Sequence, residues 1–461
     1  MHQDPGSTSL SELRHYLAAV VQDSLGRQCS SKDFGFLVVC AACAPVLMFS
    51  ELLPLTLSRA VSIGSLAIAL ACISYGLKDD RPTQIAASLF IVSCSVGWWQ
   101  ASSSDDATAH FTNLTLGLCV MSCCGLIGRS VTGRCLALRA VVLLGTVFIL
   151  VGLVTTQFTP DKLIRVGLAV VAKPFDWLPS LDLRLPGVPE VWTPTTPRYQ
   201  VNPNALAVVG LMTFFPSVAL LTFRPEARRS AVGLLGASLS LAAIVVSLSR
   251  GAMLSFLVTA LLFTGSTLTN RLRAYLSVAF FSALCVITIA VGRPIPDADL
   301  LSGGAVDSLS LRFSVWLDAV DQWRRSPFIG IGLNSFHSSP SVATTHTPSG
   351  VLYVSHAHNA VLQILLDVGL LGLVSYLVML IRAVKICDIA THRAGKEARL
   401  SLLLATVVAV HLFGSLDTLA LGAKVGLLFW AQLGLIISQI SDYQSRMSVS
   451  HVVAADTCSE A

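Results

Sequence analysis

The chain contains twelve long apolar runs, each close to the roughly 17–25 residues that a helix needs to cross the hydrocarbon core of a bilayer. Only 12% of its 461 residues are charged, about half of the ~25% that is usual in soluble domains. The runs are 34–50, 60–77, 84–101, 112–128, 138–156, 204–223, 231–249, 251–268, 274–292, 358–381, 399–416 and 423–441. The sequence therefore predicts an all-α polytopic membrane protein with about twelve transmembrane helices.

The composition also excludes two other classes of protein. With 54% hydrophobic residues, the chain is too apolar to be disordered. The net charge of +5 is small, and the basic residues are scattered along the sequence rather than gathered. A nucleic-acid partner is therefore not expected.

The distribution of Lys and Arg predicts the orientation, because these residues accumulate on the cytoplasmic side of membrane proteins. With a cytoplasmic N-terminus, most basic residues fall in cytoplasmic segments, and twelve crossings return the C-terminus to the same side. The predicted regions are a cytoplasmic tail 1–33, spans 1–9 within 34–292 with an outer loop 157–203, a second outer loop 293–357 between spans 9 and 10, spans 10–12 within 358–441, and a cytoplasmic tail 442–461.

The outer loop 293–357 is far longer than an ordinary connection, so we expect it to carry function. Within it, residues 307–325 are predicted to form an amphipathic helix, because apolar residues such as Trp316 recur at helical spacing. Asp307 or Ser308 caps this helix and Pro327 ends it. Its apolar stripe is expected to rest on the membrane domain.

Two arginines lie on the predicted outer side, against the usual distribution of charge. Arg250 occupies a tight turn in Ser249-Arg250-Gly251, and Arg312 lies on the predicted loop helix. A cation near the membrane interface is costly without a partner or an anionic ligand. Arg250 could equally snorkel to lipid headgroups, and Arg312 taken alone fits a solvated helix face.

Histidines gather where the long outer loop meets the next span, with His356 at the end of the loop and His358 at the beginning of the span. A helix N-terminus disfavours imidazolium, and a neutral imidazole is what a general base requires. The His-x-His spacing could chelate a metal, but no acid or Cys is nearby in the sequence, so no metal site is expected. Asp367 is expected to make a polar contact within the bundle, with a proton relay as the second interpretation.

The segment Gly330-Ile331-Gly332-Leu333-Asn334 has only a superficial likeness to a nucleotide-binding loop. It lies on the outer side, lacks a lysine and has no strand–turn–helix context. We expect a flexible turn after the loop helix.

In their order along the chain, these motifs resemble the O-antigen ligase and polymerase superfamily of bacterial envelope proteins. They are Ser249-Arg250-Gly251, then Arg312-x-x-x-Trp316, then Pro327-Phe328-Ile329-Gly330-Ile331-Gly332-Leu333-Asn334-Ser335-Phe336, then His358-Asn359-Ala360-x-Leu362-Gln363-x-Leu365-x-x-x-Gly369-x-x-Gly372. The resemblance covers about residues 245–375, and the first 200 residues match only as hydrophobic spans.

The resemblance implies a membrane glycosyltransferase of GT-C-like fold that needs neither metal nor cofactor. Such enzymes take a glycan from undecaprenyl diphosphate at the periplasmic face of the bacterial inner membrane. Ligases pass it to the lipid A core, and polymerases pass it to the next repeat unit. We expect the ligase, with an O-antigen or exopolysaccharide polymerase as the alternative.

The site residues expected from the sequence and this resemblance form a single set. Arg250 and Arg312 neutralise the diphosphate, and His358 is the general base, since it precedes Asn359 in the motif, although His356 could take its place. Direct displacement predicts inversion at the anomeric carbon. The remaining substrate-binding candidates are Trp316, Asn359, which could orient the imidazole or a substrate, His356, and Gly330 and Gly332, which could let the loop close over the lipid carrier.

A transporter or lipid-linked glycan flippase is the alternative from another class, because twelve spans also suit a secondary transporter. Convergence of Arg250, Arg312 and His358 at the outer face favours the transferase. A central polar path containing Asp367 favours transport.

Overall fold

The computed structural model describes most of the chain. The described residues are 31–48, 55–101, 104–155, 203–222, 227–264, 268–292, 308–336, 344–347, 350–353, 356–394, 398–419 and 421–440. The predicted loop 157–203 and the two predicted tails lie almost entirely outside these residues.

Every predicted apolar run coincides with a helix, which confirms the helical character of the chain. The helices are α2 (Ser31–Met48), α3 (Leu55–Gly76), α4 (Arg81–Gln100), α5 (Ser104–Ile127), α6 (Val131–Thr155), α9 (Pro203–Leu221), α10 (Ala227–Val246), α11 (Arg250–Thr264), α12 (Asn270–Val291), α15 (Ala360–Ala394), α16 (Ala398–Phe413) and α17 (Leu427–Ile437). Among the described residues, six of them (α3, α5, α6, α9, α12 and α15) are long and apolar enough to cross a membrane. Twelve crossings stay a prediction.

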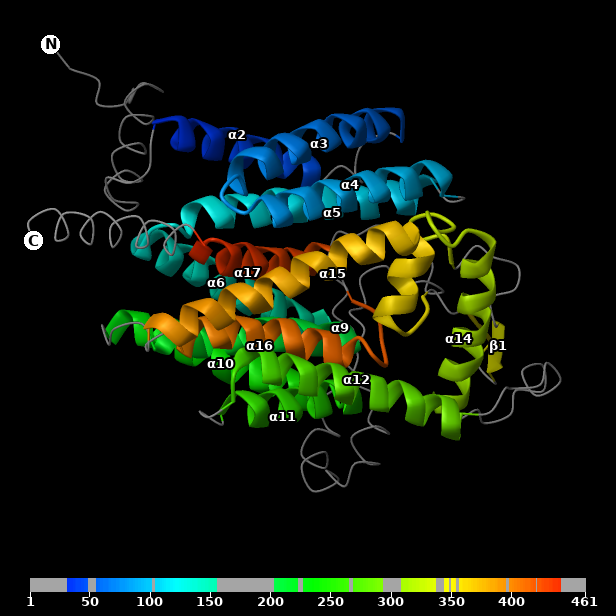
Figure 1. Ribbon diagram of the computed structural model, residues 1–461. Coiled ribbons are helices and arrows are strands. Elements are labelled where there is room, and N and C mark those ends of the chain that lie inside the picture. The colour runs from blue at the N-terminus through cyan, green and yellow to red at the C-terminus, as the bar shows by residue number, and fades with distance from the viewer. Residues whose placement is uncertain are drawn as a thin grey trace, which may run out of the picture.

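The helices lie side by side in a bundle (Figure 1). Helix α9 packs against α10, α16 and α6, whereas α4 packs against α15, and α5 against α3 and α17. Small residues allow close approach of neighbouring helices, as at Gly117, where an added Cβ would collide with the ring of Trp430. Hydroxyl groups inside the bundle bond back to their own helix, as Thr213 does to the carbonyl of Val209 at 2.8 Å. Both devices are typical of helices that pack in lipid.

At the predicted cytoplasmic end, ion pairs connect separate elements of the bundle. They are Arg129–Asp79 at 2.7 Å, Arg382–Asp80 at 2.6 Å and Arg271–Asp388 at 2.6 Å. Asp80 and Asp388 are buried, so their charges depend on these arginines.

The outer segment contains helix α14 (Ser308–Arg325), which agrees with the predicted amphipathic helix. It lies across the ends of the bundle helices, beside a short hairpin (Figure 1). Val315 and Ala319 of α14 are buried in a cluster that includes Ala357 and Leu366, so the apolar stripe rests on the membrane domain as expected. The hairpin, β1 (Thr344–Thr347) paired antiparallel with β2 (Gly350–Tyr353), was not predicted.

Helix α15 is broken at Gly369, whose φ of 66° and ψ of −167° are not helical. A short helical piece precedes this break, and a long one follows it (Figure 1). The backbone groups freed by the break bond to the segment after α14. Ile331 N donates to the Leu366 carbonyl at 2.7 Å, and Leu370 N donates to the Pro327 carbonyl at 2.9 Å. We call this contact between residues 327–333 and 366–371 the α15 joint.

The α15 joint bears on two expectations. Gly330 and Gly332 are buried, with φ of 77° and 118°, and a Cβ at Gly330 would collide with the Leu366 carbonyl oxygen. The glycines are therefore part of a packed backbone junction rather than of a flexible turn, and their closing over a lipid carrier stays a prediction. Asp367 is also used here, because its Oδ1 accepts from Asn334 N at 3.0 Å and from Gln363 Nε2 at 3.0 Å.

Candidate active site

The turn that precedes α15 carries the two histidines. Asn359 fixes the start of the helix, since its Oδ1 accepts from Val361 N at 3.0 Å and from Leu362 N at 3.2 Å, which is a helix N-cap. His358 has a φ of 48°, a left-handed conformation that costs about 1–3 kcal/mol outside glycine. Strain of this kind persists where surrounding contacts hold a side chain in place.

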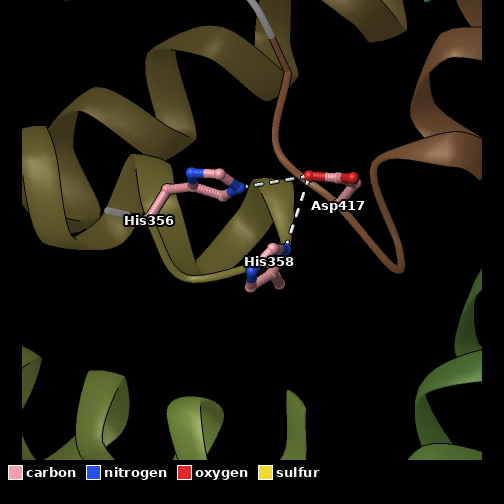
Figure 2. A group of neighbouring side chains, drawn as sticks. All are labelled: His356, His358 and Asp417. Atoms are coloured by element: carbon pink, nitrogen blue, oxygen red, sulfur yellow. Dashed lines mark hydrogen bonds and ion pairs between the residues drawn. The ribbon is translucent and has the colours of Figure 1, made fainter. Parts of the chain in front are cut away.

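Both histidines point at one carboxylate, that of Asp417 (Figure 2). Asp417 lies in the loop after α16, and its Oδ1 is 3.3 Å from His356 Nε2 and 3.5 Å from His358 Nδ1. The imidazoles are partly exposed, at 27% and 23%, whereas Asp417 is only 9% exposed. The imidazole rings can therefore be reached from outside, whereas His358 Nδ1 and the acid lie behind them.

Two further contacts hold the Asp417 carboxylate in place. Asn204 Nδ2 at the start of α9 donates to Oδ2 at 2.7 Å, and Thr418 N donates to Oδ1 at 2.8 Å. The cluster thus joins α9, the loop after α16 and the turn before α15.

The surroundings keep the two central groups in opposite charge states. Burial lowers the pKa of His358 below its usual 6.5, and the neighbouring His356 and Arg312 act in the same direction, against Asp417. Burial alone would raise the pKa of Asp417, but the two nearby histidines, one of them hydrogen-bonded to it, outweigh this, and its pKa falls well below the usual range. His358 is therefore neutral and Asp417 ionised near pH 7.

Arg312 lies directly beside this cluster. Its Nε donates to the Leu416 carbonyl at 2.8 Å, next to Asp417 in the chain. Burial lowers the pKa of Arg312, with Asp417 opposing and Arg250 adding to the effect, but a guanidinium remains charged. The same cluster therefore has a fixed positive charge.

Arg250 is the first residue of α11 and is exposed. A cation is unfavourable at a helix N-terminus, and no hydrogen bond or ion pair to Arg250 occurs within the described part of the chain. It nonetheless lies close enough to Arg312 to affect its pKa. Two guanidinium groups near a single carboxylate leave net positive charge, which suits a diphosphate.

Trp316 and Asn359 hold the histidine turn from behind. Trp316 is 5% exposed, and its Nε1 donates to the His358 carbonyl at 3.4 Å. Asn359 is 4% exposed and donates to the Ser415 carbonyl at 3.2 Å. Their side-chain polar groups therefore bond to the backbone, which makes them positioning residues in this structure.

The structure thus divides the residues singled out from the sequence. Arg250, Arg312, His356 and His358 lie together, Trp316 and Asn359 support them, and Gly330 and Gly332 belong to the α15 joint. These contacts place the candidates but do not test their roles.

Sequence reasoning missed Asp417, which is 61 residues after His356. The available signal was an acid in an otherwise apolar outer turn, within Gly414-Ser415-Leu416-Asp417. The argument that no acid supports a metal at the histidines is therefore wrong. One ligand atom from each of His356, His358 and Asp417 lies within 4.8 Å of the others.

Comparison with known protein families gives one match, to O-antigen ligase, over residues 235–377. No curated protein matches the chain. The matched region runs from α10 into α15 and includes both arginines and both histidines, whereas Asp417 lies beyond it. The match supports a function of the ligase or polymerase type and membrane glycosyltransferase-like chemistry. The resemblance to the O-antigen ligase superfamily is confirmed over residues 235–377, the segment that carries the motifs.

Proposed function

We propose that this protein is an O-antigen ligase-type glycosyltransferase. It moves a glycan from undecaprenyl diphosphate to a sugar hydroxyl of the lipid A core, at the periplasmic face of the bacterial inner membrane. The observation that carries the proposal is the meeting of a neutral imidazole, its aspartate partner and two arginines, His358, Asp417, Arg312 and Arg250, at the predicted outer end of the bundle.

His358 acts as the general base through Nε2. The acceptor hydroxyl oxygen attacks the anomeric carbon from the face opposite the diphosphate, and its proton passes to Nε2. The bond between the anomeric carbon and the diphosphate oxygen breaks, so the configuration inverts and undecaprenyl diphosphate leaves. Asp417 faces Nδ1 and stabilises the imidazolium that forms, the role that the aspartate has in a hydrolase triad.

The diphosphate leaving group is an anion, and two arginines can neutralise its charge without a metal ion. Arg312 is held by the Leu416 carbonyl, while Arg250 is exposed at the start of α11. Two guanidinium forks can bind the diphosphate oxygens in both the ground state and the transition state. The proposed reaction is therefore independent of metal ions.

The polar contacts of Asp367 support surface chemistry over transport. Its Oδ1 accepts from Asn334 N and Gln363 Nε2, which are contacts of the α15 joint. These contacts account for the buried position of Asp367 by its part in the structure of the helix break.

Reconstitution of the purified protein in lipid tests the proposal. The protein receives an undecaprenyl-diphosphate glycan in the presence of EDTA, with or without the lipid A core. We expect transfer to the core that is lost in His358→Ala and Arg312→Ala. Lengthening of the donor glycan without the core identifies a polymerase, and no turnover with either acceptor contradicts the proposal.

Arg324→Ala is the matched control for Arg312→Ala. Arg324 lies on the same helix and is exposed, so its loss removes one positive charge from α14 without touching the cluster. Thermal unfolding of every variant separates a loss of chemistry from a loss of fold.

A further inference from the structure

We propose that His356 Nε2, His358 Nδ1 and Asp417 Oδ1 form a binding site for a divalent transition-metal ion such as Zn²⁺, and that the bound ion switches the transferase off. The inhibitory half rests on the proposed function. The metal site itself does not, because it follows from the geometry of three side chains.

The distances in the cluster fit coordination better than hydrogen bonding. The carboxylate oxygen is 3.3 Å and 3.5 Å from the two imidazole nitrogens, whereas a good N–H···O bond is about 2.9–3.0 Å. Ligands about 2.0–2.2 Å from a tetrahedral Zn²⁺ are roughly 3.3–3.5 Å from one another. The two carboxylate–imidazole distances therefore match tetrahedral coordination, and the two imidazole nitrogens lie within 4.8 Å of each other.

His358 Nδ1 supplies an independent observation. This atom is buried, and within the described structure it has no hydrogen-bond partner. A buried nitrogen without a partner loses the free energy of the hydrogen bond that it makes in water. A metal ion would use its lone pair.

Two imidazoles and one carboxylate form a ligand set of the catalytic-zinc type, which leaves a fourth position open. Asn204 and Thr418 hold the carboxylate from behind, and contacts of this kind strengthen metal sites. The ion and the carboxylate together carry a net charge of about +1, so the site stays attractive to anions with metal bound.

Coordination of the ion at His358 Nδ1 prevents His358 from acting as the general base. A neutral imidazole carries one proton, so an ion on the Nδ1 lone pair leaves that proton on Nε2. Nε2 then donates a hydrogen bond and cannot accept the proton of the acceptor hydroxyl. The ion also occupies the Asp417 oxygen that would stabilise the imidazolium. Transfer is therefore resistant to EDTA and sensitive to zinc.

A metal titration must also distinguish this site from two cysteines that could bind the same ion. Cys40 Sγ of α2 and Cys72 Sγ of α3 are 3.4 Å apart, and thiols also bind zinc. Co²⁺ distinguishes the two groups, because thiolate ligands add intense near-ultraviolet charge-transfer bands that a His–His–Asp site lacks.

The direct test is a Co²⁺ titration of the full-length protein in lipid nanodiscs. We expect one equivalent with the visible absorption of tetrahedral Co²⁺, displaced by Zn²⁺. His356→Ala should weaken this binding by at least about 100-fold, and Asp417→Ala should do the same. Cys72→Ala should leave the visible bands unchanged, as should His411→Gln, whose ring contacts Tyr376 Oη and the Val407 carbonyl in the wild type. An unaltered titration in His356→Ala overturns the metal site.

The activity arm measures Zn²⁺ inhibition of glycan transfer, relative to the metal-free rate of each variant. Wild type should be inhibited and then restored by EDTA, and His356→Ala should need at least about tenfold more Zn²⁺ for half inhibition. Tight binding without inhibition, or stimulation by Zn²⁺, overturns the switch while the proposed function stands. Absence of transfer under every condition refutes the proposed function and the switch together, while the Co²⁺ titration still decides the metal site.

Discussion

The two ends of the bundle use arginine in different ways. At the predicted cytoplasmic end, Arg382 and Arg129 bind carboxylates of the loop after α3, at 2.6 Å and 2.7 Å. At the predicted periplasmic end, Arg312 bonds a backbone carbonyl, and Arg250 is exposed at a helix N-terminus.

The arginines of the predicted cytoplasmic end hold buried carboxylates, whereas those of the predicted periplasmic end are proposed to bind the diphosphate of the donor. A buried carboxylate such as Asp80, at 2% exposure, needs its arginine for stability. At the other end the buried carboxylate of Asp417 is shared with two histidines. The predictions below test this contrast, from the largest expected effect to the smallest.

Replacement of the proposed base gives the largest effect. His358→Gln should lower the rate of glycan transfer by about 10²–10⁴-fold, the usual contribution of general-base catalysis. The melting temperature should change little, because the ring is partly exposed and its Nδ1 has no hydrogen-bond partner in the described structure. Transfer rates and thermal unfolding of the same preparation check this. A large fall in the melting temperature alongside the loss of transfer would show that His358 is needed for the fold.

The opposite pattern is expected at the cytoplasmic end. Arg382→Leu leaves the Asp80 carboxylate buried without its ion pair, so the free energy of unfolding should fall by about 3–5 kcal/mol. Activity per folded molecule should be unchanged. Arg250→Leu is the matched variant, with a stability change within about 0.5 kcal/mol and a clear loss of activity. If Arg382→Leu and Arg250→Leu changed stability and activity in the same way, the two ends of the bundle would not differ in their use of arginine.

Asp417→Asn should lower the rate of transfer by no more than about 10²-fold, the lower limit of the effect expected for removal of the base itself. The amide keeps the shape of the side chain but no longer stabilises an imidazolium at Nδ1. Measurement of kcat and KM separates this from a binding defect, since the loss should appear in kcat. A change confined to KM would give Asp417 a role in substrate binding.

The smallest effect is a displacement of the pH profile. Burial lowers the pKa of His358 below 6.5, and Asp417 opposes this. Because the neutral imidazole is the active form, transfer should fall on acidification only below pH 6.5. Asp417→Asn removes the opposing influence, so its acid limb should lie at lower pH than that of wild type. A shift toward higher pH would contradict the assignment of His358.

The sequence was informative about helices because lipid makes hydrophobicity a strong local signal. All twelve apolar runs coincide with helices, and the amphipathic pattern located α14 to within a residue. The break in α15 was not foreseen, because a lone glycine in an apolar run is common in membrane helices and does not by itself mark a break.

The candidate site was only partly predictable for a similar reason. His356 and His358 are only two residues apart in the sequence and stood out, whereas Asp417 comes from the loop that follows α16. Local pattern does not reveal a contact across 61 residues. The expectation of flexible glycines failed because positive φ suits both mobile turns and packed junctions, and only the contacts of Gly330 distinguish them.

The α15 joint limits how this protein can be re-engineered. Its backbone hydrogen bonds connect the segment after α14 to both sides of the helix break. If either segment is replaced alone by that of another protein, the other segment loses its hydrogen-bond partners. A chimaera that seeks a new acceptor should carry residues 308–371 as one transplant. Grafts that stop at Pro327 or begin at Ala360 would separate backbone donors and acceptors that bond to each other across the joint.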